Sequence, residues 1–201
     1  MQIDKKKIFE LGNYTFQNFI TLNEKQVNSV WEWRNHPNIR RFMYNKEIIT
    51  FENHQKFINS LPSRDDVAYW LVFLNGNPIG VTNLVDINWI GCSAEPGSYM
   101  IPELDGTGMG LDFFYHNIKF YFSDCIGCKY LHGSIHRKNI NALLLDSYLG
   151  FVLNDEDVRN PDCEYIKISH SIYEFDKLQI DTGDVVKYVS YIKQNKKQLK
   201  L

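Results

Sequence analysis

The alternation of apolar and polar positions predicts a strand and then a helix near the start of the chain. Residues 15–21 alternate with a period of two, which is typical of a half-buried strand. Asn23 can cap a helix that runs to about residue 35, because its side chain can accept a hydrogen bond from a free N–H of the first turn. Pro37 ends that helix, since the residue before a proline avoids the helical region.

A short helix and a hairpin are predicted next. Residues 51–61 have helical spacing, with Thr50 as the cap. The strand-like segments 69–74 and 78–87 flank the Asn-Gly-Asn tripeptide 75–77, which favours a tight hairpin turn.

The glycine-rich segment Asp-Gly-Thr-Gly-Met-Gly, residues 105–110, is the most informative stretch of the chain. It separates a strand predicted over residues 92–101 from a helix predicted over residues 111–123. Alternate glycines leave backbone N–H groups free to point at an anion, and the helix N-terminus behind them adds a partial positive charge. The segment therefore predicts a pyrophosphate-binding loop made of Gly106, Thr107, Gly108, Met109 and Gly110.

Two common phosphate-binding motifs do not fit this loop. The Walker loop needs Gly-Lys-Ser/Thr, and the dinucleotide fingerprint needs a third glycine at position 111, where the chain has Leu111. The helix that follows carries Leu111, Phe114, Ile118 and Phe122 at core-facing spacing, which predicts that these side chains pack in the core.

The last third of the chain again alternates between strand and helix. Residues 130–136 form a predicted strand, a helix follows Asn139, and the Leu-Gly-Phe tripeptide 149–151 ends it. A strand over residues 164–173 and a final helix over residues 184–198 complete the predicted elements. The lysines of the final helix are interpreted as a solvent-facing surface.

The order of strand, glycine loop, helix, strand, Asn-started helix and Leu-Gly-Phe resembles the GNAT superfamily of acetyl-CoA-dependent N-acetyltransferases over residues 15–173. The resemblance implies an α/β (α+β) fold with a mixed, mostly antiparallel twisted sheet of about seven strands flanked by helices. It also implies a splayed strand pair that holds CoA, acetyl-CoA as co-substrate, and no metal. The family's loop starts with Gln or Arg where this chain has Asp105. Because a carboxylate repels a pyrophosphate, either Asp105 faces solvent or the affinity for CoA is lower.

The resemblance also indicates where CoA binds. The strand backbone at Tyr99, Met100 and Ile101 is expected to pair with the pantetheine amides. Asn139 is expected to hold the pantetheine arm, to cap its helix, or to do both. Arg137 and the lysine after it can meet the CoA phosphates, with an ordinary charged surface as the alternative.

Acetyl transfer to an amine needs an acceptor for the amine proton and a proton for the departing thiolate. Glu95 matches the strand position from which family members often present a glutamate, so it is the candidate base, with a solvent-facing carboxylate as the alternative. His136 and His132 are further candidates on one face of a strand, where a histidine is more often structural.

The candidate proton donor is the position at which this chain differs most from the family. The tyrosine that usually donates the proton corresponds to Asp146 here, and a carboxyl group donates at neutral pH only if burial raises its pKa. Tyr148 is near in sequence, but two residues along a helix is about 200° around it, so it replaces residue 146 only if the helix has already ended. The thiolate can also leave to water. Asp146 and Tyr148 are therefore the candidate catalytic residues at this end of the site.

On the acceptor side, the chain resembles the acetyltransferases of the pseudaminic acid pathway, which acetylate the 4-amino group of a UDP-linked aminodeoxyhexose for surface glycans. The likeness lies in residues 31–44, 51–58 and 69–73. Arg34, Tyr44 and His54 match the segment that lines the sugar-nucleotide side. Arg34 can pair a diphosphate bidentately, and Tyr44 can stack on a base or sugar. The apolar residues of this segment are interpreted as packing residues.

Two alternatives stay open. A GNAT enzyme could acetylate another amine, such as a protein N-terminus, an aminoglycoside or an amino acid derivative, although the cluster of Arg34, Arg40 and Arg41 favours an anionic acceptor. The chain could also be a non-catalytic module that binds CoA or a sugar nucleotide, because Asp105 and Asp146 replace the family's usual residues.

Composition favours a single domain over residues 1–201. A chain of 201 residues with 14% aromatic content can bury a substantial core. A net charge of −2 argues against a non-specific nucleic-acid binder, and no apolar run reaches the ~18 to 20 residues of a membrane span. The first residues also lack the apolar core of a signal peptide, so the chain is expected to stay in the cytoplasm. A small-molecule substrate is what the family resemblance implies. The oligomeric state stays open, a homodimer included.

Cysteine usage fits the same picture. Cys125 and Cys128 have the spacing of half a zinc site, but no second Cys pair or His pair completes it. They are interpreted as two thiols of a reduced protein.

Overall fold

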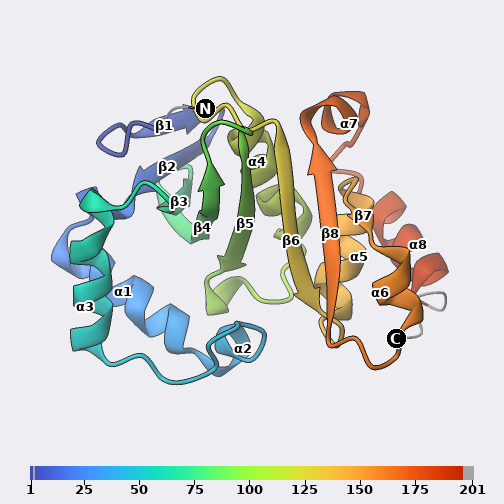
Figure 1. The fold of residues 1–201 in the computed structure, drawn as a ribbon, viewed down its shortest axis with the longest axis horizontal. Coiled ribbons are helices and arrows are strands. Elements are labelled where there is room, and N and C mark those ends of the chain that lie inside the picture. Colours follow the sequence, from blue (N-terminus) through green and yellow to red (C-terminus); the bar gives the residue numbers. More distant parts are fainter. Residues whose placement is uncertain (2, 197–201) are drawn as a thin grey trace.

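The structure is a computed structural model that describes residues 1 and 3–196 and contains an eight-stranded sheet (Figure 1). The strands are β1 Phe9–Leu11, β2 Tyr14–Asn18, β3 Ala68–Leu74, β4 Asn77–Asn88, β5 Ser93–Met100, β6 Tyr130–His136, β7 Val152–Leu153 and β8 Tyr165–Ser171. They follow the order β1-β2-β3-β4-β5-β6-β8-β7. All neighbours are antiparallel except β5 and β6. The predicted mixed, mostly antiparallel sheet is confirmed, with eight strands instead of about seven.

Helices cover both faces and one end of this sheet. They are α1 Glu24–Asn35, α2 Pro37–Arg40, α3 Phe51–Ser60, α4 Gly110–Phe122, α5 Ile140–Tyr148, α6 Asp155–Arg159, α7 Ile172–Lys177 and α8 Val185–Asn195. In Figure 1, α1 and α3 lie beside the half of the sheet that holds β1 to β4, and α5 to α8 gather beside β6 to β8. Three short 3₁₀ segments, Phe19–Thr21, Leu61–Ser63 and Pro102–Leu104, complete the elements.

Local side-chain chemistry explains where several elements begin. Asn23 forms a capping box with Gln26 at the start of α1, and Thr50 caps α3. The hairpin between β3 and β4 turns at Asn75 and Gly76, whose φ angles of 50° and 78° suit the Asn-Gly sequence. The predicted caps and turn are therefore confirmed.

Some predicted boundaries were wrong for local reasons. The first predicted strand ends at Asn18, because the Asn18 side chain accepts a hydrogen bond from the Ile20 N–H (3.2 Å) and starts a 3₁₀ turn. Pro37 ends α1 as predicted but also opens α2, since proline is tolerated in the first turn of a helix. The final helix begins one residue later than predicted, after Asp184 as its cap, and positions 197–198 lie outside the described residues.

The core lies on both faces of the sheet. On one face Phe16 stacks on Phe120 of α4 with ring centroids 3.9 Å apart, and Trp70 meets Phe120 edge-on. On the other face, Leu71 joins Val30 of α1 in a second cluster. Since successive side chains of a strand point to opposite faces, Trp70 and Leu71 place β3 at the centre of both clusters.

The parallel strands β5 and β6 separate soon after they meet. They pair only at Ser93 with Tyr130 and at Ala94 with Leu131, and then they diverge (Figure 1). This is the predicted splayed pair. Beyond Ala94, one edge of β5 still pairs with β4 while its other edge faces the gap.

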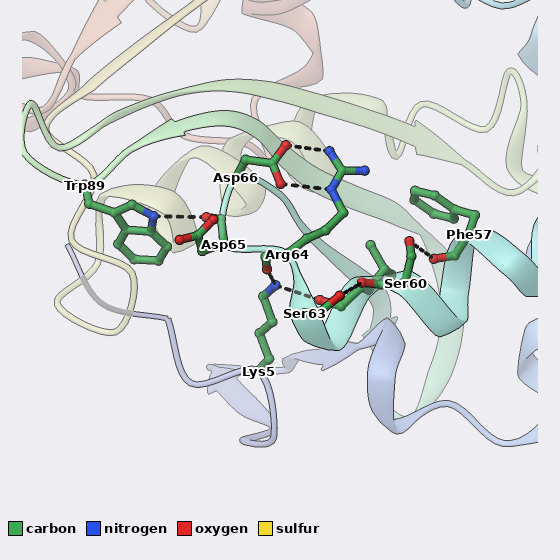
Figure 2. A network of polar contacts seen from close by, with 9 residues as sticks. Lys5, Phe57, Ser60, Ser63, Arg64, Asp65, Asp66 and Trp89 are labelled. Atoms are coloured by element: carbon green, nitrogen blue, oxygen red, sulfur yellow. Dashed lines mark hydrogen bonds and ion pairs between the residues drawn. The ribbon is translucent and has the colours of Figure 1, made fainter.

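A polar network fastens the end of α3 to the rest of the protein (Figure 2). Lys5 donates to the carbonyls of Leu61 (3.0 Å) and Arg64. Arg64 in turn holds Asp66 through two hydrogen bonds of 2.8 and 2.5 Å, and the Trp89 indole donates to the Asp65 carbonyl. The network holds the C-terminal end of the helix that carries His54 and Phe57.

Candidate active site

A cavity of about 770 Å³ opens where β5 and β6 diverge. Strands β4, β5 and β6 line it together with α4, α5, the glycine loop and the segment between α2 and α3. It contains most of the predicted site residues: Arg34, Tyr44, His54, Glu95, Tyr99, Met100, Ile101, Gly106, Gly108, Gly110, Asn139 and Asp146. Side chains separated by more than 100 positions in sequence thus share one cavity.

Glu95 is at the start of the divergence, where Tyr44 reaches it from the other wall. The Tyr44 phenol donates to Glu95 Oε1 at 2.8 Å and lies 2.9 Å from Ser134 Oγ. Burial raises the pKa of Tyr44, and its bond to Glu95 adds to the effect. A side chain at Gly133 would crowd Glu95, since a Cβ there would lie 3.2 Å from Glu95 Cγ. Glycine at 133 therefore leaves room for the carboxylate beside β6.

The two histidines of β6 differ in position. His136 lines the cavity, but its Nδ1 accepts from the Lys138 N–H and its Nε2 lies 3.3 Å from Glu164 Oε1. His132 does not line the cavity. Glu95 therefore fits the part of general base better than either histidine.

Arg34 brings a half-buried positive charge to the acceptor side. Its Nη2 donates to the Asn45 carbonyl at 2.9 Å, while its Nη1 is buried without a partner among the described residues. Burial lowers the pKa of the guanidinium, and interaction with the Tyr99 and Tyr69 side chains partly offsets this. Because an arginine stays charged at neutral pH and this side chain lines the cavity, Arg34 is suited to bind an anion.

His54 lies beneath the same side of the cavity. It is 4% exposed, and its Nε2 has no partner in the described part of the chain. Burial lowers its pKa, so the imidazole is neutral at pH 7. His54 can therefore donate or accept a hydrogen bond without adding a charge.

Asp146 faces the cavity from α5 and is half-buried. Burial raises the pKa of its carboxyl group to about 7. A substantial fraction of Asp146 is thus protonated at neutral pH, as a proton donor must be. The sequence could not show whether Asp146 is shielded from water, and the structure shows this shielding.

Tyr148 does not line the cavity, which corrects the expectation that it is a catalytic candidate. Helix α5 continues to Tyr148, so residues 146 and 148 point in different directions. The Tyr148 ring packs instead against Tyr188 and Tyr191 of α8, with centroids 5.0 Å away in both cases.

The glycine residues of the loop line the cavity. Gly106 and Gly108 have φ angles of 76° and 84°, which glycine adopts without strain. A Cβ built at either position meets nothing within 4 Å, so the backbone is open to an approaching group. The Met109 side chain makes no capping hydrogen bond at the start of α4. The Thr107 N–H donates to the Leu104 carbonyl at 3.3 Å, so the N–H groups that can receive an anion are those of the glycines and of the first turn of α4.

Two predicted loop residues lie elsewhere. Thr107 and Met109 do not line the cavity: Thr107 donates to the Leu104 carbonyl at 2.7 Å, and Met109 packs against the core. Asp105 is exposed and accepts a 3.4 Å hydrogen bond from Asn38. Asp105 also lines the cavity beside Gly106, so both alternatives for this carboxylate, facing solvent or lowering the affinity for CoA, stay open.

Two residues of the second half have structural contacts. Asn139 lines the cavity and also caps α5 through the Ala142 N–H (3.4 Å). Arg137 donates to the backbone carbonyls of Cys163 and Asn160 at 2.7 and 2.6 Å, and also to that of Asp157. The guanidinium of Arg137 therefore holds the loop before β8, and a contact of Arg137 with CoA phosphates stays a prediction.

Sequence reasoning missed several lining residues. Phe114, predicted as core, lines the cavity, and Asn117 on the same helix donates to Ser98 Oγ at 3.2 Å. A polar residue within an apolar helix was the available signal for Asn117. Tyr188 of α8 also lines the cavity, and no local pattern in the sequence indicated it.

Metal and membrane features were searched within residues 1 and 3–196. No group of three or more His, Cys, Asp or Glu side chains in this part of the chain is placed to hold a metal ion. None of the described helices has the length and apolar character needed to cross a bilayer.

Comparison with known proteins places this site in context. The acetyltransferase (GNAT) domain family matches residues 18–152. Acetyltransferase PseH from Campylobacter jejuni subsp. jejuni serotype O:2 is 36% identical over 141 residues, which cover 70% of this chain and 86% of that protein. PseH from serotype O:23/36 is 35% identical over the same shares of the two chains.

Solved structures share the fold. The crystal structure of Campylobacter jejuni N-acetyltransferase PseH in complex with acetyl coenzyme A has a TM-score of 0.62 at 24% identity, over 79% of this chain and 99% of that chain. Spermidine N-acetyltransferase from Vibrio cholerae in complex with CoA and spermine has a TM-score of 0.71 at 18% identity, over 83% and 100% of the two chains.

Proposed function

Because the chain belongs to the acetyltransferase (GNAT) domain family, we propose that it transfers an acetyl group from acetyl-CoA to the 4-amino group of a UDP-linked aminodeoxy sugar. The observation that carries this proposal is that Glu95, Asp146 and Arg34 face one cavity. They provide a base, an acid and a site for an anion. The proposal also places the enzyme in the cytoplasm and treats the chain as one domain. Whether the enzyme forms a homodimer stays open.

Acetyl-CoA fits the half of the cavity between β5, β6 and α4. The open backbone at Gly106 and Gly108, followed by the α4 N-terminus, suits the pyrophosphate. The edge of β5 around Tyr99 that faces the gap offers backbone groups to the pantetheine amides. The solved PseH structure with acetyl coenzyme A has the same fold and supports this choice of donor.

The acceptor fits the half of the cavity beneath α1 to α3. The positive charge of Arg34, which lines the cavity, favours a diphosphate, and neutral His54 adds a hydrogen-bonding group. The 36% identity to PseH supports an amino sugar as the acceptor. A polyamine such as spermidine is disfavoured on this side of the cavity, because Arg34 repels a polycation.

The chemistry follows from two proton transfers. Glu95 accepts a proton from the amine as its nitrogen bonds to the thioester carbonyl carbon. Asp146 donates its proton to the sulfur as the carbon–sulfur bond breaks, which yields the amide and free CoA thiol. The proton taken up by Glu95 and that lost by Asp146 are exchanged with solvent, so both groups return to their starting states.

A release assay for CoA thiol tests the proposal. UDP-linked 4-amino sugars, aminoglycosides, peptides and spermidine are offered with acetyl-CoA, and CoA binding is measured by calorimetry. Turnover confined to the amino sugars is expected. If only another amine is turned over, that amine becomes the acceptor in place of the amino sugar. CoA binding without turnover of any amine would favour the non-catalytic module.

A further inference from the structure

Helix α8 lies beyond residues 18–152 that match the family, yet it packs on the helix that carries Asp146. Ser147 Oγ of α5 lies 2.8 Å from the Tyr191 hydroxyl of α8. The Tyr148 ring contacts both Tyr188 and Tyr191. Three tyrosines and one serine thus join the two helices.

Tyr188 is the residue of α8 that reaches the cavity. It lines the cavity together with Asp146, whereas Tyr191 does not. Burial raises the pKa of Tyr188 to about 12, and the nearby Asp146 carboxylate adds to this. The two side chains are therefore close enough for the Asp146 carboxylate to act on the ionisation of the Tyr188 phenol.

The groups around Asp146 leave burial as the cause of its protonation. Burial is the one effect that raises the pKa of Asp146, and no charged neighbour contributes among the described residues. The acidic groups near the start of α8, Asp181 and Asp184, act instead on Tyr148. The side chains that shield the Asp146 carboxyl group from water therefore decide its protonation state.

Tyr188 itself is a poor proton donor in this site. An alkyl thiol such as cysteine has an ordinary pKa of about 8.5. A phenol with a pKa of about 12 would give its proton to such a thiolate only against an unfavourable equilibrium. A carboxyl group with a pKa of about 7 gives it readily.

We propose that Tyr188 is a positioning residue whose ring covers the Asp146 carboxyl group on the α8 side, so that α8 completes the thioester end of the active site. The inference rests on the proposed role of Asp146 as the proton donor. With the ring in place, bulk water is kept from the carboxyl group and the neutral form is favoured. With the ring removed, Asp146 is hydrated and ionises at neutral pH.

The test measures Asp146 directly and turnover separately. The Asp146 carboxyl group is titrated by ¹³C NMR in the full chain, and kcat is measured from pH 5 to 9. In Tyr188→Ala the NMR midpoint is expected to move from near 7 toward the ordinary Asp value of about 4, with kcat at pH 7.5 falling roughly tenfold. Tyr188→Phe keeps the ring and should retain both the midpoint and most of kcat.

Val186→Ala is the control, because it removes side-chain atoms from an exposed position of the same helix outside the cavity, without touching the contacts to α5. It should leave the Asp146 midpoint unchanged. If Tyr188→Ala does not fold, Tyr188→Leu preserves apolar packing on α5 and is expected to lower the midpoint in the same direction.

Three results would overturn the inference: an unchanged midpoint in the folded Tyr188→Ala or Tyr188→Leu variant, an equal shift in Val186→Ala, or a loss of kcat in Tyr188→Phe as large as in Tyr188→Ala. The titration does not depend on turnover. If Asp146→Asn keeps full activity while Tyr188→Ala still lowers the midpoint, the proposed donor fails but the positioning role of Tyr188 stands.

Discussion

The phenol of Tyr44 donates a 2.8 Å hydrogen bond to the carboxylate of Glu95, although 51 positions separate the two residues in sequence. Tyr44 lies between α2 and α3, and Glu95 lies on β5 where β6 diverges. The contact joins the wall of the acceptor side to the candidate base. It changes the interpretation of Tyr44, which was expected to stack on a base or sugar.

Glu95→Gln tests the base. The amide cannot accept the proton of the amine, so kcat/KM at neutral pH should fall by about 10²- to 10³-fold. Steady-state kinetics with the amino-sugar acceptor measure the change. Glu164→Gln, which alters an exposed carboxylate outside the cavity, should stay near the wild type. A preserved kcat/KM in Glu95→Gln would remove Glu95 from the mechanism.

Tyr44→Phe removes the hydrogen bond to Glu95 but keeps the ring. A hydrogen bond to a charged group contributes on the order of 1.5–3 kcal/mol, so kcat/KM should fall roughly 10- to 100-fold. Tyr173→Phe changes an exposed tyrosine on α7 and serves as the control. A Tyr44→Phe enzyme with unaltered kcat/KM would show that the contact does not orient the base.

Asp146 should control the alkaline side of the pH profile. Its carboxyl group must be protonated to donate, and its pKa of about 7 means that the protonated fraction falls as the pH rises through 7. The kcat of the wild type should therefore decline above pH 7. Asp146→Asn should lower kcat at neutral pH and abolish this decline, while the exposed Asp155→Asn should keep it. A decline that persists in Asp146→Asn would belong to another group.

Arg34→Ala should weaken binding of the anionic acceptor. Loss of the guanidinium removes a charge-assisted contact, so KM for the UDP-linked sugar should rise roughly 10- to 100-fold while KM for acetyl-CoA stays constant. Arg34→Lys should recover part of the loss, because lysine keeps the charge without the bidentate geometry. Arg159→Ala on α6 is the surface control. An equal rise in both KM values would indicate a distorted cavity.

His170 should make the fold sensitive to acid. It is 2% exposed among the rings of Phe122, Phe151 and Phe175, and burial lowers its pKa to about 4 from an unfolded value near 6.5. Because the folded pKa is depressed, this stability is complete above pH 6.5 and is lost as the pH falls toward 4.

That loss amounts to about 3 kcal/mol for the full shift. Urea unfolding followed by circular dichroism from pH 7.5 to 4 measures it. His170→Leu, which has no group to protonate, should flatten this part of the pH dependence. An equally steep loss in His170→Leu would assign the acid sensitivity to other groups.

Much of the fold was determined locally and could be predicted from the sequence. The Asn23 cap, the Asn75-Gly76 turn and the loop of Gly106 and Gly108 depend on side chains that bond to their own backbone, or on φ angles that few residues adopt. Alternation likewise located the main strands, because a strand buried on one face must repeat every two residues. The order of these elements was enough to indicate the family.

Only the tertiary structure decided how the site is enclosed. Tyr44 meets Glu95, Tyr188 lines the cavity with Asp146, and Arg137 binds backbone carbonyls because the chain brings distant segments together. The raised pKa of Asp146 has the same origin, since burial belongs to the packed molecule and to no single stretch of residues. The sequence determined which chemical groups are available and on which elements they lie, and long-range packing decided which of them face one another.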